Sequence, residues 1–320
     1  MNTTPRVSVI LPNYNHARFL KERIDSILNQ TFQDFELILL DDCSSDNSVE
    51  VLEEYRNNPH VSHIELNEQN CGSPFMQWEK GIRLAKGEYI WIAESDDRAD
   101  PEFLTATVSQ LDRHPDAQLC ITGSFIIDGN GHLISTDEFD RWEEDGKAYL
   151  FRSHDYLISR MLKANTVYNA SMVLFRKNDC LTNIAPQYRQ MRYCGDWLFW
   201  IEQIRKGSII EIHRKLNYFR KHDYNTTRKG IKDEKIIKEV AFIKNLLYTQ
   251  IVRDGKAILE DKYSFYVYVK HFDVYSPERT QELLKMIAQE AHTTYWHYKK
   301  WKIYNSYIKH IKPLFAKTKT

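Results

Sequence analysis

The stretch Gly-Glu-Tyr-Ile-Trp-Ile-Ala-Glu-Ser-Asp-Asp, residues 87–97, decides the fold of this chain. Its apolar run, Tyr89–Ala93, leads directly into three acids, Glu94, Asp96 and Asp97. Such a run, bounded by glycine and by charge, predicts a strand that is buried on both faces. Open α/β sheets bind ligands at the carboxyl ends of these strands, and two adjacent aspartates repel each other unless a cation accompanies them. Two interpretations follow: a site for a hard divalent cation that also binds a diphosphate, or a solvated turn that caps the next helix.

Length and composition are typical of a soluble globular protein with one large domain or two. The chain has 320 residues, of which 42% are hydrophobic and 28% charged. Lys+Arg and Asp+Glu both number 44, so no basic field indicates a nucleic-acid partner. No apolar run approaches the roughly 20 residues of a membrane span, and no signal-peptide pattern opens the chain. The five cysteines are scattered without a CxxC pair, which favours reduced thiols in the cytoplasm.

Strands and helices alternate on both sides of the opening stretch. Strands are expected at 6–12, 35–40 and 61–66, and helices at 17–30, 49–55 and 78–85. This alternation predicts an α/β fold with a doubly wound, mostly parallel sheet and right-handed crossovers. The second strand also ends in paired acids, Asp41 and Asp42, before a helix-capping residue, Ser45 or Asp46. Two acidic strand ends should therefore share one edge of the sheet.

The second half of the chain is expected to be less regular. Further strands are predicted at 118–127, 172–176, 208–213 and 216–219, with helices at 103–111 and from Trp197, and an irregular excursion at 135–152. From about Asp233 the helical period dominates to the end. We therefore expect a domain boundary near residue 230, with 231–320 forming a helical extension.

Four motifs, in their order and spacing, resemble the family 2 glycosyltransferases. They are Val-Ser-Val-Ile-Leu-Pro-Asn-Tyr-Asn (7–15), Asp-Asp-Cys-Ser-Ser-Asp (41–46), the opening stretch (87–97) and Gly-Asp-Trp (195–197). Each motif is weak alone, whereas four in register are a strong signal. The resemblance implies a GT-A fold, in which a nucleotide-sugar half at about 1–127 joins an acceptor half at about 128–230. It also implies inverting transfer from a nucleoside-diphosphate sugar, with Mg²⁺ or Mn²⁺ as the cofactor.

The resemblance assigns the donor site to four residues. Pro12 and Tyr14 match positions that line the pocket for the nucleotide base, and the Tyr14 ring could stack on that base. Asp42 matches the acid that accepts a hydrogen bond from the base, while its neighbour Asp41 could instead orient the loop. Asp96 matches the acid near the ribose.

The resemblance also assigns the metal and the acceptor side. Asp97 matches the residue that ligates the metal, and Glu94, which shares a face with Asp96, could assist. His222 stands in a segment similar to the family's Tyr-Arg-x-His, so it could ligate the metal, contact the diphosphate or be a surface residue. Asp196 matches the general base that deprotonates the acceptor hydroxyl, a role compatible with capping the helix that follows.

The expected function is therefore a metal-dependent inverting glycosyltransferase of cell-surface polysaccharide biosynthesis. The expected donor is a UDP-sugar, with GDP- and dTDP-sugars as alternatives, and the expected acceptor is a saccharide or lipid-linked hydroxyl. A nucleotidyltransferase is an alternative, although its usual Gly-rich basic loop is absent at 12–16. A non-catalytic sugar-nucleotide-binding protein is another, but it would have no use for an acceptor base.

The C-terminal tail leaves two interpretations open. Residues 295–319 contain seven lysines and no acid, and aromatic and aliphatic residues recur there at helical spacing: Tyr298, Trp301, Tyr304, Ile308 and Ile311. A basic amphipathic helix of this kind suggests peripheral contact with an anionic membrane, at the inner face of the cell membrane for a cytoplasmic protein. The same pattern also fits a helix that packs on its own domain with solvated lysines.

Overall fold

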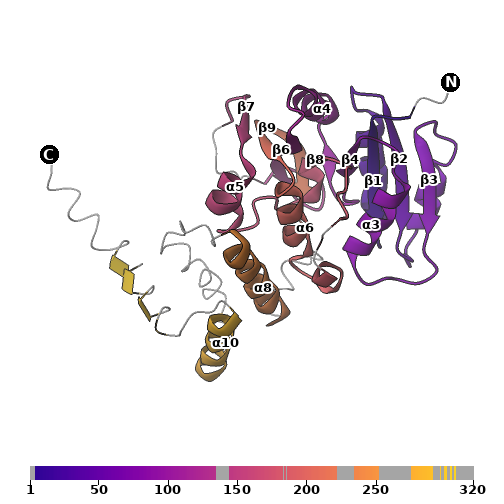
Figure 1. The fold of residues 1–320 in the computed structure, drawn as a ribbon. Helices are drawn as coiled ribbons and strands as arrows, with labels where there is room; N and C mark the ends of the chain where they lie inside the picture. Colours follow the sequence, from indigo (N-terminus) through magenta and orange to yellow (C-terminus); the bar gives the residue numbers. More distant parts are fainter. Residues whose placement is uncertain are drawn as a thin grey trace. The chain divides into compact units, whose positions relative to one another are not determined.

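The computed structural model describes residues 4–134, 144–182, 184, 186–221, 234–251 and 275–290, together with 296, 299, 300, 303, 304, 306 and 307 (Figure 1). The chain divides into two compact units. The first comprises Met1–Leu157 and Asn165–Asn225, and the second comprises Ile158–Ala164 and Thr226–Thr320.

A mixed sheet organises the first unit. Its nine strands, counted over the described residues, follow the order β3-β2-β1-β4-β8-β6-β9-β5, and β7 pairs with β9. The strands are β1 (Val7–Asn13), β2 (Phe35–Asp41), β3 (Val61–Leu66), β4 (Tyr89–Ile92), β5 (Arg98–Ala99), β6 (Ala117–Ile127), β7 (Ala148–Phe151), β8 (Val173–Arg176) and β9 (Ser208–Arg220). The pairs β2–β3, β1–β2, β1–β4 and β6–β9 are parallel, whereas β8 is antiparallel to both of its neighbours. The predicted doubly wound, mostly parallel α/β sheet is confirmed.

Helices connect these strands, and all except the short helix Ser153–Tyr156 lie at predicted places. They are α1 (Ala17–Leu28), α2 (Ser48–Glu53), α3 (Pro74–Leu84), α4 (Phe103–Arg113), α5 (Ser153–Tyr156) and α6 (Gly195–Ile204), with short helical turns at Leu157–Met161, Ala170–Met172 and Pro186–Gln190. α3 begins four residues earlier than its periodicity predicted, because Pro74 has the fixed φ that suits a first helical turn. The cap predicted for α2 is wrong: Asn47 holds that position, and Asp46 instead bonds the backbone N–H groups of Ala17 and Ser48.

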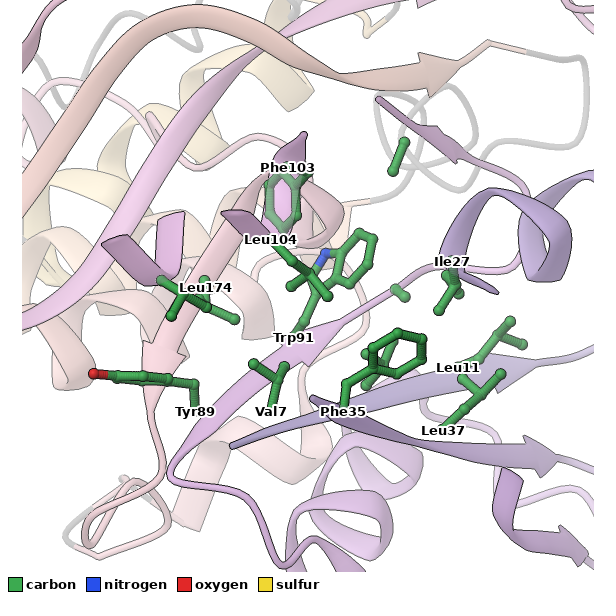
Figure 2. Close-up of a cluster of buried hydrophobic side chains, with 14 of the residues drawn as sticks. Val7, Leu11, Ile27, Phe35, Leu37, Tyr89, Trp91, Phe103, Leu104 and Leu174 are labelled. Atoms are coloured by element: carbon green, nitrogen blue, oxygen red, sulfur yellow. The ribbon is translucent and has the colours of Figure 1, made fainter. Parts of the chain in front are cut away.

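Buried apolar side chains explain why the sheet forms where it does. All residues of β1, β2 and β4 are buried, as expected for parallel strands that are covered on both faces. Trp91 of β4 stacks on Phe103 of α4 with ring centroids 4.5 Å apart, and Figure 2 shows both rings within the main hydrophobic cluster. Gly87 permits the close entry of β4, since a Cβ atom there would lie 2.6 Å from the backbone nitrogen of Ser8.

Two predictions for the second half of the sheet are wrong. The strands expected at 208–213 and 216–219 form one continuous strand, β9, whose pairing with β6 shifts register between Thr122 and Ser124. The polar run His-Arg-Lys at 213–215 has the composition of a loop, which is why two strands were predicted. In the structure this run lies in β9 at the register shift, and the Arg214 guanidinium bonds Glu102. β7 falls inside the predicted irregular excursion, because its residues are mostly exposed and give no buried pattern.

The second unit contains two long helices among its described residues, α8 (Glu234–Ile251) and α10 (Pro277–Glu290). α8 buries apolar side chains at the predicted helical spacing, namely Ile237, Val240, Ile243 and Leu247. Arg279 of α10 bonds both carboxylate oxygens of Glu234 on α8. No helix within the described ranges is long and apolar enough to cross a bilayer.

Candidate active site

Asp41 holds the loop that follows β2. Its carboxylate accepts hydrogen bonds from Asn13 Nδ2 at 2.7 Å, from Ser44 Oγ at 2.7 Å and from the Ser44 backbone N–H at 2.8 Å. Ser44 Oγ also accepts the backbone N–H of Asn15, which has a positive φ of 56°. Asp41 therefore ties the end of β1 to the end of β2 and shapes the loop between them.

Asp42 is oriented by donors from a different direction. It is 5% exposed, and its Oδ1 accepts hydrogen bonds from Asn67 Nδ2 (2.8 Å), Gln77 Nε2 (2.8 Å) and the Cys71 backbone N–H (3.0 Å). The Lys80 ammonium bonds the amide oxygen of Asn67 at 3.0 Å, so it supports the side chain that donates to Asp42. Hydrogen bonds from neighbouring amide groups thus fix the orientation of Asp42, the predicted base-binding acid, without a bound nucleotide.

The two other predicted donor residues follow β1. Pro12 is buried within the strand, opposite Leu40, so it can form a wall but offers little surface. Tyr14 exposes 48% of its surface just beyond the strand end, as a stacking ring requires. His16 Nδ1 lies 2.8 Å from Ser95 Oγ, which joins this loop to the acidic turn after β4.

Asp97 lies inside the acidic turn and has no exposed surface. Its Oδ2 accepts hydrogen bonds from Asn169 Nδ2 (2.8 Å) and Ser171 Oγ (2.7 Å), and its Oδ1 accepts the Arg220 backbone N–H (3.0 Å). Both carboxylate oxygens of the predicted metal ligand are therefore occupied by protein donors. A cation at Asp97 would have to share the carboxylate oxygens with these donors.

Glu94 and Asp96 are less buried than Asp97 and complete the acidic turn. Burial, reinforced by the charges of Asp96 and Asp97, raises the pKa of Glu94 to about 8, although Trp78 Nε1 donates a 3.0 Å hydrogen bond to it. Burial and the charge of Asp96 likewise raise the pKa of Asp97. Such mutual repulsion at a strand end is relieved by a cation, and carboxylate oxygens suit Mg²⁺ or Mn²⁺. Across the described residues, however, no three acid, histidine or cysteine side chains converge as a ready-made metal site.

Arg220 fastens the acidic turn from β9. Its guanidinium is buried, bonding the carbonyl of Asp96 at 2.7 Å, the carbonyl of Asp128 at 3.1 Å and the carboxylate of Glu22. From sequence, Arg220 is distinguished only by its place two residues before His222. His222 itself lies outside the described residues.

Asp196 stands in the first turn of α6. A Cβ at Gly195 would lie 2.3 Å from the ring of Phe75, so glycine allows α6 to begin directly against α3. The Asp196 carboxylate accepts a 2.9 Å hydrogen bond from Asn165 Nδ2, while Asn165 Oδ1 accepts the backbone N–H of Val167. The predicted general base is partly exposed and held in one orientation.

Two segments bring the predicted residues together. Residues 165–171 join the general base to the acidic turn, because Asn165 bonds Asp196 and Asn169 bonds Asp97. One turn of α3 does the same for the donor loop. Its Gln77 bonds the carboxylate that follows β2, its Trp78 bonds the first acid of the turn after β4, and its Phe75 packs against the start of α6. Hydrogen bonds and packing thus link the three predicted clusters to one another.

Sequence reasoning missed the residues that orient these acids. Asn165, Asn169 and Ser171 lie shortly before the buried strand β8, and this polarity beside an apolar strand was the available signal. Gln77 and Trp78 gave no signal, because in an amphipathic helix they resemble ordinary packing residues.

Comparison with protein families identifies the class of protein to which this chain belongs. The model named Glycosyl transferase family 2 matches residues 8–177, more than half of the chain. The chain belongs to glycosyltransferase family 2. The match begins in β1 and ends just after β8, so this glycosyltransferase carries the loops of Asp42 and Asp97 inside the family region.

Two relatives illustrate the similarity in sequence. An uncharacterized glycosyltransferase of Methanocaldococcus jannaschii is 30% identical over 213 residues, covering 65% of this chain and 68% of the relative. The poly(ribitol-phosphate) beta-N-acetylglucosaminyltransferase TarS of Staphylococcus aureus is 32% identical over 227 residues, covering 70% of this chain but only 36% of TarS. This glycosyltransferase therefore corresponds to about a third of TarS.

Two solved structures share the fold. Residues 1–349 of S. aureus TarS align with a TM-score of 0.59 and 19% identity, over 95% of this chain and 91% of that one. The mannosyltransferase PcManGT of Pyrobaculum calidifontis, solved with GDP-Man and Mn²⁺, aligns with a TM-score of 0.54 and 16% identity, over 96% and 85%. The predicted GT-A fold and the assignment as a glycosyl-transfer enzyme are confirmed.

Proposed function

We propose that this enzyme is a metal-dependent, inverting glycosyltransferase that transfers a sugar from a UDP-sugar to a hydroxyl of a saccharide or lipid-linked acceptor in cell-surface polysaccharide biosynthesis. The observation that carries the proposal is the segment 165–171, which holds an acid suited to deprotonate an acceptor beside the acids that face a donor. TarS, named for N-acetylglucosamine transfer to poly(ribitol phosphate) and solved with UDP and UDP-GlcNAc, supports the donor class and the cell-surface role.

On the donor side, we propose that Tyr14 stacks on the base, with Pro12 as the wall beneath it. Asp42 accepts a hydrogen bond from the base, since its orientation is already fixed by Asn67 and Gln77. A preoriented acceptor costs less entropy on binding than a mobile one, which favours selective recognition of the nucleotide.

The acidic turn fits a divalent cation because it concentrates carboxylate oxygens whose repulsion is only partly balanced. We propose that Asp96 is its first contact, with Glu94 beside it, and that Asp97 fixes the turn unless its bonds open. When bound, Mg²⁺ or Mn²⁺ would stabilise the diphosphate leaving group as a Lewis acid. PcManGT, solved with Mn²⁺, supports this cofactor class.

On the acceptor side, Asp196 takes the proton of the attacking hydroxyl. Asn165 donates to Oδ2 of Asp196 and so fixes the orientation of the carboxylate that takes the proton. A single displacement needs no protein nucleophile, so one correctly oriented carboxylate is sufficient for this half of the reaction.

A screen of nucleotide-sugars tests the proposal. Melting temperatures of the full chain would be measured with UDP-, GDP- and dTDP-sugars, with and without Mn²⁺, followed by donor hydrolysis and transfer assays. We expect the largest stabilisation from a UDP-sugar with Mn²⁺, because a ligand that binds only the folded state raises stability by about 2.7 kcal/mol at 100 times its Kd. Stabilisation by nucleoside triphosphates without sugar transfer would instead support a nucleotidyltransferase. Donor binding without hydrolysis or transfer would support a non-catalytic sugar-nucleotide-binding protein.

We further propose that the C-terminal tail contacts an anionic membrane at the inner face of the cell membrane. Among its described helical residues, large apolar side chains remain exposed, namely Trp296, Ile303, Tyr304 and Tyr307, and the Lys300 ammonium lies over the Trp296 ring. These apolar residues fall on one side of a helix with lysines beside them, which suits an acidic bilayer surface.

Co-sedimentation with liposomes tests this contact. The full chain should partition onto vesicles that contain anionic lipid and less onto neutral vesicles, whereas a chain that ends at Ala291 should remain in solution. Trp296→Ala/Ile303→Ala is the finer variant, and Lys285→Ala, on α10, is its control. Equal partitioning of the full and shortened chains would exclude the tail as the membrane contact.

A further inference from the structure

Arg23 of α1 is a buried charge without a hydrogen-bond partner. The residue has no exposed surface, and within the described part of the chain none of its three guanidinium nitrogens makes a hydrogen bond. A buried charge of this kind costs several kcal/mol unless other charges compensate for it. Its presence therefore needs a physical explanation.

The surroundings of Arg23 place its charge against β4, the strand that leads into the acidic turn. The guanidinium carbon lies 4.9 Å from the centroid of the Trp91 ring, which also stacks on Phe103. Trp91 stands in β4, three residues before Glu94, and its Nε1 donates to the carbonyl of Ser171. A cation–π contact accommodates a guanidinium without hydrogen bonds, so Arg23 can remain charged in this apolar setting.

The electrostatics agree with this placement. Burial lowers the pKa of Arg23 to about 10, while the charges of Asp97, Asp96 and Glu94 act in the opposite direction. The side chain thus stays positive at neutral pH. Its compensation comes through space chiefly from Asp97 and Asp96, because Glu94, with a pKa of about 8, is mostly protonated at neutral pH.

Other cations around the turn are engaged differently. Arg220 bonds the carbonyl of Asp96 and the carboxylate of Glu22, and Arg98 pairs with the same Glu22 at 3.0 Å. Part of their charge is therefore neutralised by a neighbour outside the turn. Arg23, one position after Glu22, has no such ion pair among the described residues.

We propose that Arg23 is the internal counter-ion of the acidic turn. It balances part of the carboxylate charge when no cation is bound, and it opposes a divalent cation when one arrives, so it sets the affinity of the turn for metal. Arg23 is then a positioning residue for glycosyl transfer that acts without touching the donor. The inference rests on the metal dependence proposed above.

Mn²⁺ binding to the full-length protein without donor tests the inference. Arg23→Met keeps much of the side-chain volume but removes the charge, and Arg23→Lys keeps the charge. Affinity would be measured by electron paramagnetic resonance of free Mn²⁺, and melting temperature with and without the ion. We expect Arg23→Met to melt lower than the wild type in the absence of metal yet to bind Mn²⁺ about tenfold more tightly, because the competing positive charge is gone. Arg23→Lys should bind Mn²⁺ like the wild type.

The matched control is Lys21→Met, which removes one positive charge from the exposed side of the same helix and should leave Mn²⁺ affinity unchanged. A folded Arg23→Met protein that binds Mn²⁺ no better than the wild type would overturn the inference, since a packing role alone predicts equal or weaker binding.

If Arg23→Met does not fold, Arg23→Gln is the second neutral variant to be measured. Failure of both neutral variants to fold in Mn²⁺ would also contradict the proposal, because the ion should supply the missing charge. A wild-type protein that ignores Mn²⁺ while transferring sugar would overturn both the metal dependence and this inference, but not the transferase activity.

Discussion

Asp196→Asn should leave donor binding intact and lower the rate of sugar transfer by about 10²–10⁴-fold, the usual contribution of a positioned general base. Asparagine keeps the shape of the side chain, and its amide oxygen can still accept the hydrogen bond from Asn165 Nδ2. The start of α6 against Phe75 should therefore be preserved. What is lost is the capacity to take the acceptor proton.

Donor affinity would be measured by calorimetry and transfer by single-turnover kinetics, so that binding and chemistry are separated. Asp179→Asn, at an exposed turn with a positive φ of 47°, is the matched control because asparagine tolerates that conformation and no site residue is touched. Wild-type transfer rates in Asp196→Asn would show that another group accepts the proton.

The second large effect is expected in the acidic turn, where Asp96→Asn and Asp97→Asn should differ. Asp96→Asn should fold like the wild type and lose Mn²⁺ binding, with transfer reduced by about 10²–10³-fold, as when one group that stabilises developing charge is removed. Asp97→Asn should lose stability as well. It leaves donors of Asn169, Ser171 and Arg220 facing a neutral amide in a buried site, at a cost of about 3 kcal/mol.

Thermal unfolding and Mn²⁺ titration of both variants provide the measurement. A loss of about 3 kcal/mol lowers the melting temperature by roughly 6–12 °C in a domain of this size. If Asp97→Asn kept wild-type stability and lost Mn²⁺, whereas Asp96→Asn kept Mn²⁺, Asp97 would be the direct ligand, as the family motif predicts. Asp116→Asn, whose exposed carboxylate accepts a hydrogen bond from Ser208 Oγ, controls for loss of a surface charge.

Much of the fold could be predicted from sequence because the first four strands alternate regularly with helices and three of them, β1, β2 and β4, are fully buried. The acids at 41–42 and 96–97 could also be placed at one sheet edge, since strand ends are set by local pattern. The different roles of the two acids within each pair could not be predicted. Asp96 and Asp97 are neighbours in sequence, and distant donors at 169, 171 and 220 decide which of them is buried. Such contacts between residues far apart in the chain leave no periodic signal.

The strands of the second half were harder for a related reason. The pairing of β9 with β6 shifts register in the middle of β9, and the polar residues there have the composition of a loop. β7 exposes most of its residues, so it shows no buried pattern. Patterning predicts a strand only where burial is regular. The orienting role of Asn165 toward Asp196 was hidden in the same way, because it depends on a contact rather than on a motif.

The single turn of α3 that touches three parts of the site has a consequence for how this enzyme can change. Inserting or deleting one residue inside α3, between Phe75 and Trp78, would rotate the two parts of the helix by about 100° relative to each other, so Phe75, Gln77 and Trp78 could not all keep their partners. Length variation within this turn of α3 should therefore be rare among functional variants. The turn at 128–132 is tied to Arg220 through the carbonyl of Asp128 rather than to α3, so a change of length there should leave these three contacts in place.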